Sequence, residues 1–122
     1  MKNIGLHEIT EEHLLGEWHV ENRFNITNDT SSIFSKNNRL IFEQNSYLAI
    51  NGLNVSGEWS VSMKTELIYN PLLTFYVEKK LIAEAIITRL IISEEDYLNK
   101  KNAFVLTLYF TNGLELILNK KS

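Results

Sequence analysis

Apolar and polar side chains alternate with a period of two along most of this sequence. Between Gly16 and Phe24, glycine, apolar and amide residues take the even positions, whereas charged residues and a histidine take the odd ones. The same pattern returns several times, with turn residues between its segments. Because successive side chains of a strand point to opposite sides, period two is typical of strands with one buried face. The alternation therefore predicts an antiparallel all-β protein.

Short turn signals divide the alternating pattern into strands. Asn51-Gly52 and Asn112-Gly113 supply the positive φ angles that a two-residue hairpin turn requires. Residues 79–80 predict another tight turn, and Pro71 predicts a bulge, edge or break because proline cannot donate to a sheet ladder. Eight strands are expected, over residues 14–24, 39–44, 47–50, 53–63, 66–78, 81–93, 104–110 and 114–119.

Three segments depart from the period-two alternation. Residues 81–93 are apolar on both faces, and their β-branched side chains favour a strand, but a helix over 81–90 is the alternative because Ala, Glu and Leu form helices well. The charged segment 93–102 is expected to be a surface loop or short helical turn. One helical turn is predicted near the N-terminus, where Thr10 can cap Glu11 and Glu12.

A meander of eight strands without covering helices has to hide its edge strands, and closure into a barrel does so directly. We therefore expect one domain over residues 1–122: a small eight-stranded antiparallel up-and-down barrel. Both tryptophans follow a glycine by two residues, in a repeated Gly-Glu-Trp triplet. We expect Gly16 and Gly57 to make room for inward indoles of Trp18 and Trp59 at one end of the barrel.

Composition argues against several classes of function. The net charge is -3 and lysines are interleaved with glutamates, so the basic stripe of a nucleic-acid-binding protein is missing. The chain has no cysteine, which excludes disulfides, thiolate metal sites and thiol catalysis. No apolar run has the length of a signal-peptide core or a membrane helix, so we expect a cytoplasmic protein without membrane contact.

Few residues suggest catalysis or metal binding. His7, His13 and His19 recur every six residues, a spacing that brings no two of them together as metal ligands, and no later histidine is available for haem. The serines of residues 56–62 share an outward face without a histidine. We therefore expect no catalytic residue, no metal and no cofactor.

Glu84 and Arg89 lie on opposite parities of one predicted strand, so one of the two is expected to face inward. Parity with the apolar residues 83, 85 and 87 favours Arg89. An arginine inside an apolar barrel would require a counter-anion from the protein or from a ligand. The alternative is an Arg89 that extends outward into water at the strand end.

The order of these features resembles the lipocalin and calycin superfamily. A short helical turn precedes the first-strand Gly-x-Trp motif at Gly16 and Trp18, a long loop follows that strand, and a second Gly-x-Trp occurs in mid-chain. The chain is most similar to compact bacterial lipocalin-like domains, over nearly its whole length. The resemblance implies a barrel with a lid loop, residues 25–38, at its mouth.

Two features of the larger lipocalins have no counterpart in this chain. Their Thr-Asp-Tyr type motif is absent. The arginine that usually packs on the first tryptophan from the last strand is absent as well, and the end of this chain offers Lys120 and Lys121 instead.

We expect a binding protein for a small hydrophobic or amphipathic molecule, capped by residues 28–36. The expected wall and lid residues are Phe24, Ile33, Phe34, Phe42, Tyr47, Phe75, Tyr76 and Arg89. Because eight strands are wide enough for packed side chains or for one small ligand, the alternative is a filled barrel that acts as a protein-interaction or homodimeric module through Ile41, Tyr109 and Ile117. A barrel-type isomerase or cyclase, a third hypothesis, would need Arg89, Glu84, Asn22 or a tyrosine inside.

Overall fold

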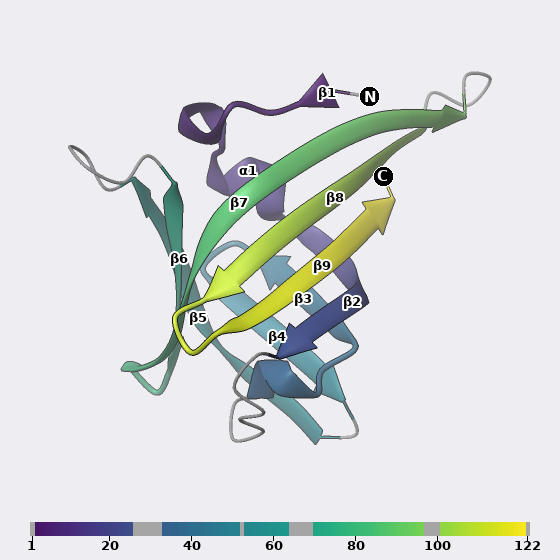
Figure 1. Ribbon diagram of the computed structural model, residues 1–122. Coiled ribbons are helices and arrows are strands. Elements are labelled where there is room, and N and C mark those ends of the chain that lie inside the picture. Colours follow the sequence, from purple (N-terminus) through teal and green to yellow (C-terminus); the bar gives the residue numbers. More distant parts are fainter. Residues whose placement is uncertain (1, 26–32, 52, 64–69, 97–100, 122) are drawn as a thin grey trace.

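The chain forms a closed antiparallel β-barrel (Figure 1). The computed structural model describes residues 2–25, 33–51, 53–63, 70–96 and 101–121. Each barrel strand pairs with the next one along the chain, and the last strand pairs with the first, which confirms the predicted up-and-down barrel. The barrel strands are β2 (Gly16–Asn25), β3 (Arg39–Glu43), β4 (Ser46–Asn51), β5 (Leu53–Met63), β6 (Pro71–Val77), β7 (Lys80–Asp96), β8 (Lys101–Phe110) and β9 (Leu114–Lys121).

An N-terminal segment adds to the outside of this barrel. The short strand β1 (Lys2–Asn3) pairs with Ile91 and Ile92 of β7, beyond the part of β7 that pairs with β6. The helices η1 (Leu6–Glu8) and α1 (Glu11–Leu14) follow. At α1 the backbone N–H of Thr10 donates to His13 Nδ1 at 3.0 Å, which ties down the first turn of the predicted short helix.

The long apolar segment is a strand along its whole length, so the helical alternative for residues 81–90 is wrong. The predicted loop over 93–102 is also wrong in part, because β7 continues to Asp96 and β8 begins at Lys101. Backbone pairing of Ser93 with Ala103 and of Glu94 with Asn102 extends the hairpin. Ladder bonds join backbone groups, so polar side chains do not prevent them.

The tight turns join the predicted strands, but two of them differ in detail from the prediction. Between β6 and β7, positive φ angles of 51° and 67° occur at Glu78 and Lys79, so the turn lies one residue earlier than expected. Between β8 and β9, Gly113 has a φ of 92° and its N–H donates to the Phe110 oxygen at 3.0 Å, so the turn spans residues 111–113 and not the predicted two residues. The Leu114 N–H donates to Asn112 Oδ1 at 3.2 Å. The β4–β5 hairpin is confirmed, although Gly52 itself lies outside the described residues. β6 begins at Pro71, which agrees with the prediction that this proline interrupts a strand.

Both tryptophans are buried on the inner face, as predicted, but their glycines act differently from our expectation. A Cβ at Gly57 would lie 1.9 Å from the backbone oxygen of Tyr76 on the neighbouring strand. Gly16 has a φ of +120°, and a Cβ there would lie 2.9 Å from Cδ of Lys120. The nearest atoms thus belong to other strands and not to the indole two residues later.

The two ends of the barrel are closed by different groups. We call the end that holds α1 and the β3–β4 turn the helix end, and the opposite end, where β2 connects to β3, the lid end. At the helix end, Trp18 Nε1 donates to the Leu14 oxygen at 2.8 Å, and Trp59 Nε1 donates to the Glu43 oxygen at 2.7 Å. Both buried indoles therefore have partners for their polar atoms.

Candidate functional site

A phenyl ring from outside the sheet fills the lid end of the barrel. Phe34 belongs to the short helix η2 (Ile33–Ser35), between β2 and β3, and its side chain is fully buried. Its ring centre lies 4.5 Å from that of Phe75, 4.9 Å from that of Phe110 and 6.3 Å from that of Tyr47. A connecting segment therefore contributes a central side chain to the core. Residues 26–32 of the expected lid lie outside the described residues.

Tyr47 is one of the aromatic residues near Phe34, and its hydroxyl is buried without a hydrogen-bond partner among the described residues. Tyr47 extends inward from β4 and is only 2% exposed. Burial, together with the charge of Glu58, raises the pKa of Tyr47 to about 12. The hydroxyl is therefore protonated at neutral pH and can donate a hydrogen bond. An unpaired buried hydroxyl is unusual, because it has lost its water partners without replacement.

The inward arginine of the barrel is Arg23, and a bulge in β2 places it there. Val20 pairs with Leu118 and Asn22 with Ile117, so Glu21 is an extra residue that reverses the parity of the strand. Beyond the bulge, Arg23 pairs with Leu116, which is fully buried, and paired residues share a face of the sheet. The guanidinium is thus turned to the interior at the lid end.

Arg23 binds the lid segment through its backbone oxygens. Its Nε donates to the oxygen of Phe34 at 3.2 Å, and its Nη2 donates to the backbone oxygen of Asn37 and, at 3.4 Å, to Asn37 Oδ1. Asn37 is itself 1% exposed, and its Nδ2 donates to the oxygen of Arg39 at 3.2 Å. These bonds hold residues 34–37 across the end of the barrel.

The electrostatic setting of Arg23 is unusual for an arginine. Partial burial lowers its pKa from the ordinary value, because the charged form loses water. Every acceptor that Arg23 contacts among the described residues is a neutral amide oxygen. The acid–base contacts found among the described residues join Glu8 to His7 and join Glu17 to His19 and Arg39. Among the described residues, the site therefore contains an inward positive charge without a matching carboxylate.

Arg89 faces outward, which agrees with the alternative expectation and not with the inward position that parity favoured. A second bulge explains the difference: Ile87 pairs with Leu108 and Arg89 with Thr107, so Thr88 is an extra residue in β7. After the bulge Leu90 takes the buried position and Arg89 is exposed. Glu84 pairs with Thr74 on the outer face. The arginine that sequence parity placed inside is therefore outside, and a different arginine is inside.

Phe24 is also placed differently from our expectation, because the β2 bulge turns it outward, where it is 52% exposed. Tyr76 is half-buried and pairs with the exposed Glu58, so it lies on the outer face of β6. Asn22 is exposed as well. These three side chains do not line the interior of the barrel in this conformation.

The remaining expected wall and lid residues lie together in the interior. Phe42 is buried, with its ring 4.6 Å from Trp59 and 6.0 Å from Phe75. Tyr47 and Phe75 approach edge to face at 5.1 Å. Ile33 is half-buried and packs against the core. The structure thus brings together five of the eight residues: Ile33, Phe34, Phe42, Tyr47 and Phe75.

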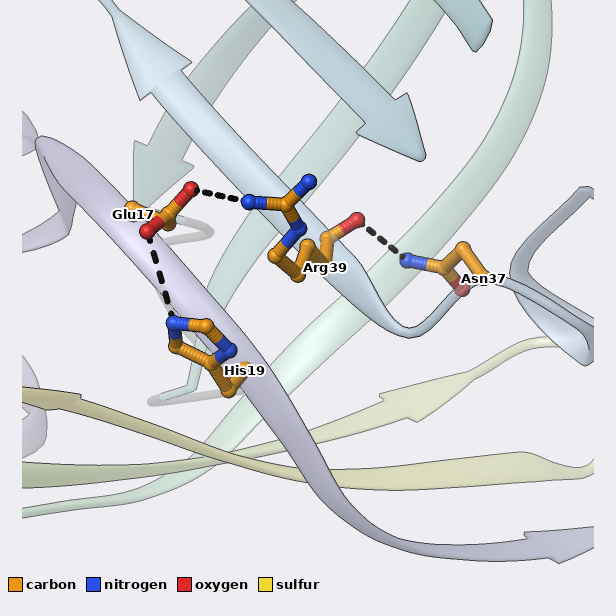
Figure 2. A network of polar contacts seen from close by, with 4 residues as sticks. All are labelled: Glu17, His19, Asn37 and Arg39. Carbon is orange, nitrogen blue, oxygen red and sulfur yellow. Dashed lines mark hydrogen bonds and ion pairs between the residues drawn. The ribbon is translucent and has the colours of Figure 1, made fainter. Parts of the chain in front are cut away.

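Charged residues of β2 and β3 form a separate network on the outer face (Figure 2). Glu17 Oε1 lies 3.0 Å from Arg39 Nη1, and Glu17 Oε2 lies 3.4 Å from His19 Nε2. Figure 2 shows Glu17 between these two side chains, with Asn37 bonded to the backbone of Arg39. The glutamate of the first Gly-Glu-Trp triplet therefore takes part in surface ion pairs, which contribute little to stability.

Metal-ligand geometry is not found in the part of the chain that the structure describes. There, no group of three or more His, Cys, Asp or Glu side chains is placed to hold an ion. One hollow of the surface, of about 510 Å³, is bordered by Thr10, Glu11, Glu12, Leu15 and Gln44. No helix among the described ranges is long and apolar enough to span a membrane.

Three residues of the two barrel ends were not predicted from the sequence. Alternation places Arg23 on the outer face, Asn37 belongs to a segment with the composition of a polar loop, and Lys120 stands out only where the larger lipocalins have an arginine. The sequence contains one usable signal, the apolar pair Ile33-Phe34 within an otherwise polar segment. Comparisons with protein-family models, with curated proteins and with solved structures find no match for this chain.

Proposed function

We propose that this protein is a lipocalin-like binding protein that holds one small hydrophobic or amphipathic molecule at the lid end of its barrel. One observation carries the proposal: Phe34, from a connecting segment, occupies the interior and packs against both Phe75 and Phe110. Such a segment can open locally without breaking a strand ladder. The volume that the Phe34 ring fills is then the volume that a ligand takes.

The surroundings of that ring suit an apolar guest with a polar group. Aromatic side chains form the wall, and the protonated hydroxyl of Tyr47 is available as a donor. A ligand oxygen that accepts this hydrogen bond would remove the cost of burying the hydroxyl alone, which is about 1–3 kcal/mol. An eight-stranded barrel has room for packed side chains or for one small ligand.

The assignment to a lipocalin-like class rests on the helix end. Gly16 and Trp18 follow α1 on the first barrel strand, in the arrangement of the family motif. Lys120, from the last strand, places its Nζ 4.7 Å from the centre of the Trp18 ring. It lies where the larger lipocalins usually have an arginine. This similarity of arrangement supports the proposal.

The experiment is a binding titration with phenylnaphthylamine, a neutral apolar dye that fluoresces on entering a dry site. The variant Phe34→Ala removes the lid ring, and Phe42→Ala is the matched control because it removes an equally buried ring of a strand. Phe34→Leu is a milder second variant, since a buried Phe→Ala change costs about 3–5 kcal/mol. Circular dichroism establishes that each variant is folded.

Saturable binding of one dye per chain, at least about tenfold tighter to Phe34→Ala than to Phe42→Ala, is the expected result, because only the first change empties the lid end. Phe34→Leu should fall between Phe34→Ala and the unaltered protein. Equal binding to both alanine variants, or no binding by any folded variant, would refute the proposal.

An outer row that contains two exposed aromatic residues favours a second candidate, a protein-interaction or homodimeric module. Phe24, Glu115, Tyr109 and Ile86 are successive partners across β2, β9, β8 and β7. Phe24 is 52% exposed and Tyr109 is 36% exposed. Light scattering tests this candidate: a dimer that Phe24→Ser converts to a monomer would favour it, and a monomeric unaltered protein would exclude homodimerisation.

A further inference from the structure

We infer that the ligand class is an arylalkyl carboxylate, whose carboxylate pairs with Arg23 while its ring takes the place of the Phe34 ring. This inference rests on the proposed function and specifies the chemistry of the same site. It starts from the lid, because the lid presents an aromatic ring to the barrel and an oxygen to Arg23 at the same time.

The atoms of Phe34 include the carbon skeleton of such a ligand. Its carbonyl carbon, Cα, Cβ and ring form a phenylpropionyl group. The carbonyl oxygen of this group accepts a hydrogen bond from Arg23 Nε at 3.2 Å. The ring of the same group lies 4.5 Å from Phe75 and 4.9 Å from Phe110. A free molecule with this skeleton can make both contacts at once.

A carboxylate would serve Arg23 better than the lid does. The guanidinium is partly buried and bonds to neutral oxygens of Phe34 and Asn37. Burial of a charge is compensated best by an opposite charge, and a carboxylate can accept two parallel N–H bonds from one guanidinium. An uncharged oxygen cannot provide this attraction between opposite charges. The additional attraction between the carboxylate and the guanidinium offsets the contacts that are lost when the ligand displaces the lid.

The interior also argues against a cationic ligand. Among the described residues, the charged group that faces inward at the lid end is Arg23, and the buried polar groups of the interior are the Tyr47 hydroxyl and Asn37. A cation would meet a like charge there, and no carboxylate of the described part of the chain is placed to balance it. The charge pattern therefore selects an acid or, with less affinity, its neutral analogue.

Isothermal titration of Phe34→Ala with hydrocinnamate and with hydrocinnamamide tests the inference. The two molecules share ring and chain length and differ in charge. We expect the acid to bind at least about tenfold more tightly than the amide, because a charge-assisted bond to arginine is stronger than a neutral one. In Phe34→Ala with Arg23→Gln, the preference should disappear while the dye still binds. Arg23→Lys should retain part of it.

The outcomes separate this inference from the proposed function. If phenylnaphthylamine binds to Phe34→Ala but acid and amide bind equally, the carboxylate inference is wrong and the binding function stands. If the dye does not bind, the proposed function fails first. The comparison of acid with amide needs no Arg23 variant, so a misfolded Arg23→Gln protein does not prevent the test. An acid preference that persists in a folded Arg23→Gln variant would also overturn the role of Arg23.

Discussion

The ammonium group of Lys120 lies 4.7 Å from the centre of the Trp18 ring, near the end of β9 and the start of β2. The same group is 4.7 Å from the Phe104 ring and donates to the oxygens of His13 at 3.0 Å and Leu15 at 2.6 Å. These oxygens lie at the C-terminal end of α1, where a cation is favoured. Lys120 thus joins α1, β2 and β9 at the helix end.

Replacement of Lys120 by Met should destabilise the protein by about 2 kcal/mol, because it removes charge-assisted bonds and a cation–π contact but keeps the apolar stem. Urea unfolding followed by tryptophan fluorescence measures the change. Lys80→Met is the control, since Lys80 is exposed at the start of β7, and it should change the free energy of unfolding by less than about 0.5 kcal/mol. Equal effects of the two changes would contradict the role given to Lys120.

Gly57→Ala should destabilise the barrel severely, by about 3 kcal/mol or more, because backbone cannot move aside as easily as a side chain. The new Cβ would lie 1.9 Å from the Tyr76 oxygen. At Gly5 the nearest atom to a new Cβ is a Glu8 side-chain oxygen at 3.1 Å, so Gly5→Ala is a tolerated control. Thermal unfolding compares the two. A Gly57→Ala protein as stable as the control would disprove the close approach of β5 and β6.

Tyr47→Phe should stabilise the protein at neutral pH by about 1 kcal/mol, because it removes a buried hydroxyl without a partner. The pH dependence should change as well. The pKa of Tyr47 is raised to about 12 in the folded protein, so the stability linked to its neutral form is complete below about pH 10 and is lost as the pH rises toward 12. Urea unfolding at neutral and alkaline pH should show that the unaltered protein loses more stability than Tyr47→Phe. A destabilised Tyr47→Phe protein would mean that the hydroxyl has a partner.

Asn37→Ala should weaken the hold on the lid. Asn37 links Arg23 to the backbone of Arg39, and its side chain is buried. We expect a loss of about 1–2 kcal/mol in stability, as for other buried hydrogen-bonded groups, together with tighter dye binding in a protein that retains Phe34. A loss of stability without any gain in dye binding would show that Asn37 does not control access to the interior.

The fold was predictable because alternation and turn signals are local. The strands, the hairpin at Asn112-Gly113, the break at Pro71 and the inward tryptophans all follow from patterns within a few residues. Closure into a barrel follows from the need to cover strand edges. The extension of β7 to Asp96 was missed, because its pairing depends on the backbone of the partner strand and not on side-chain polarity.

The candidate site was harder to predict because two bulges govern it. Each adds a residue to its strand, at Glu21 and at Thr88, and reverses every later side chain. Parity counted along the sequence therefore placed Phe24 and Arg89 inside and Arg23 outside. An uninterrupted count could not detect either reversal. The sequence shows the lid only as an apolar pair in a polar segment. It does not show that this segment reaches into the interior of the barrel.

The central claim is that the ring of Phe34 occupies the ligand's place. The most direct measurement is a set of nuclear Overhauser effects between phenylnaphthylamine and folded Phe34→Ala. We predict contacts from the dye to the ring protons of Phe75 and Phe110, the two rings nearest to Phe34. Contacts only to the outer row that contains Phe24 and Tyr109 would contradict the account.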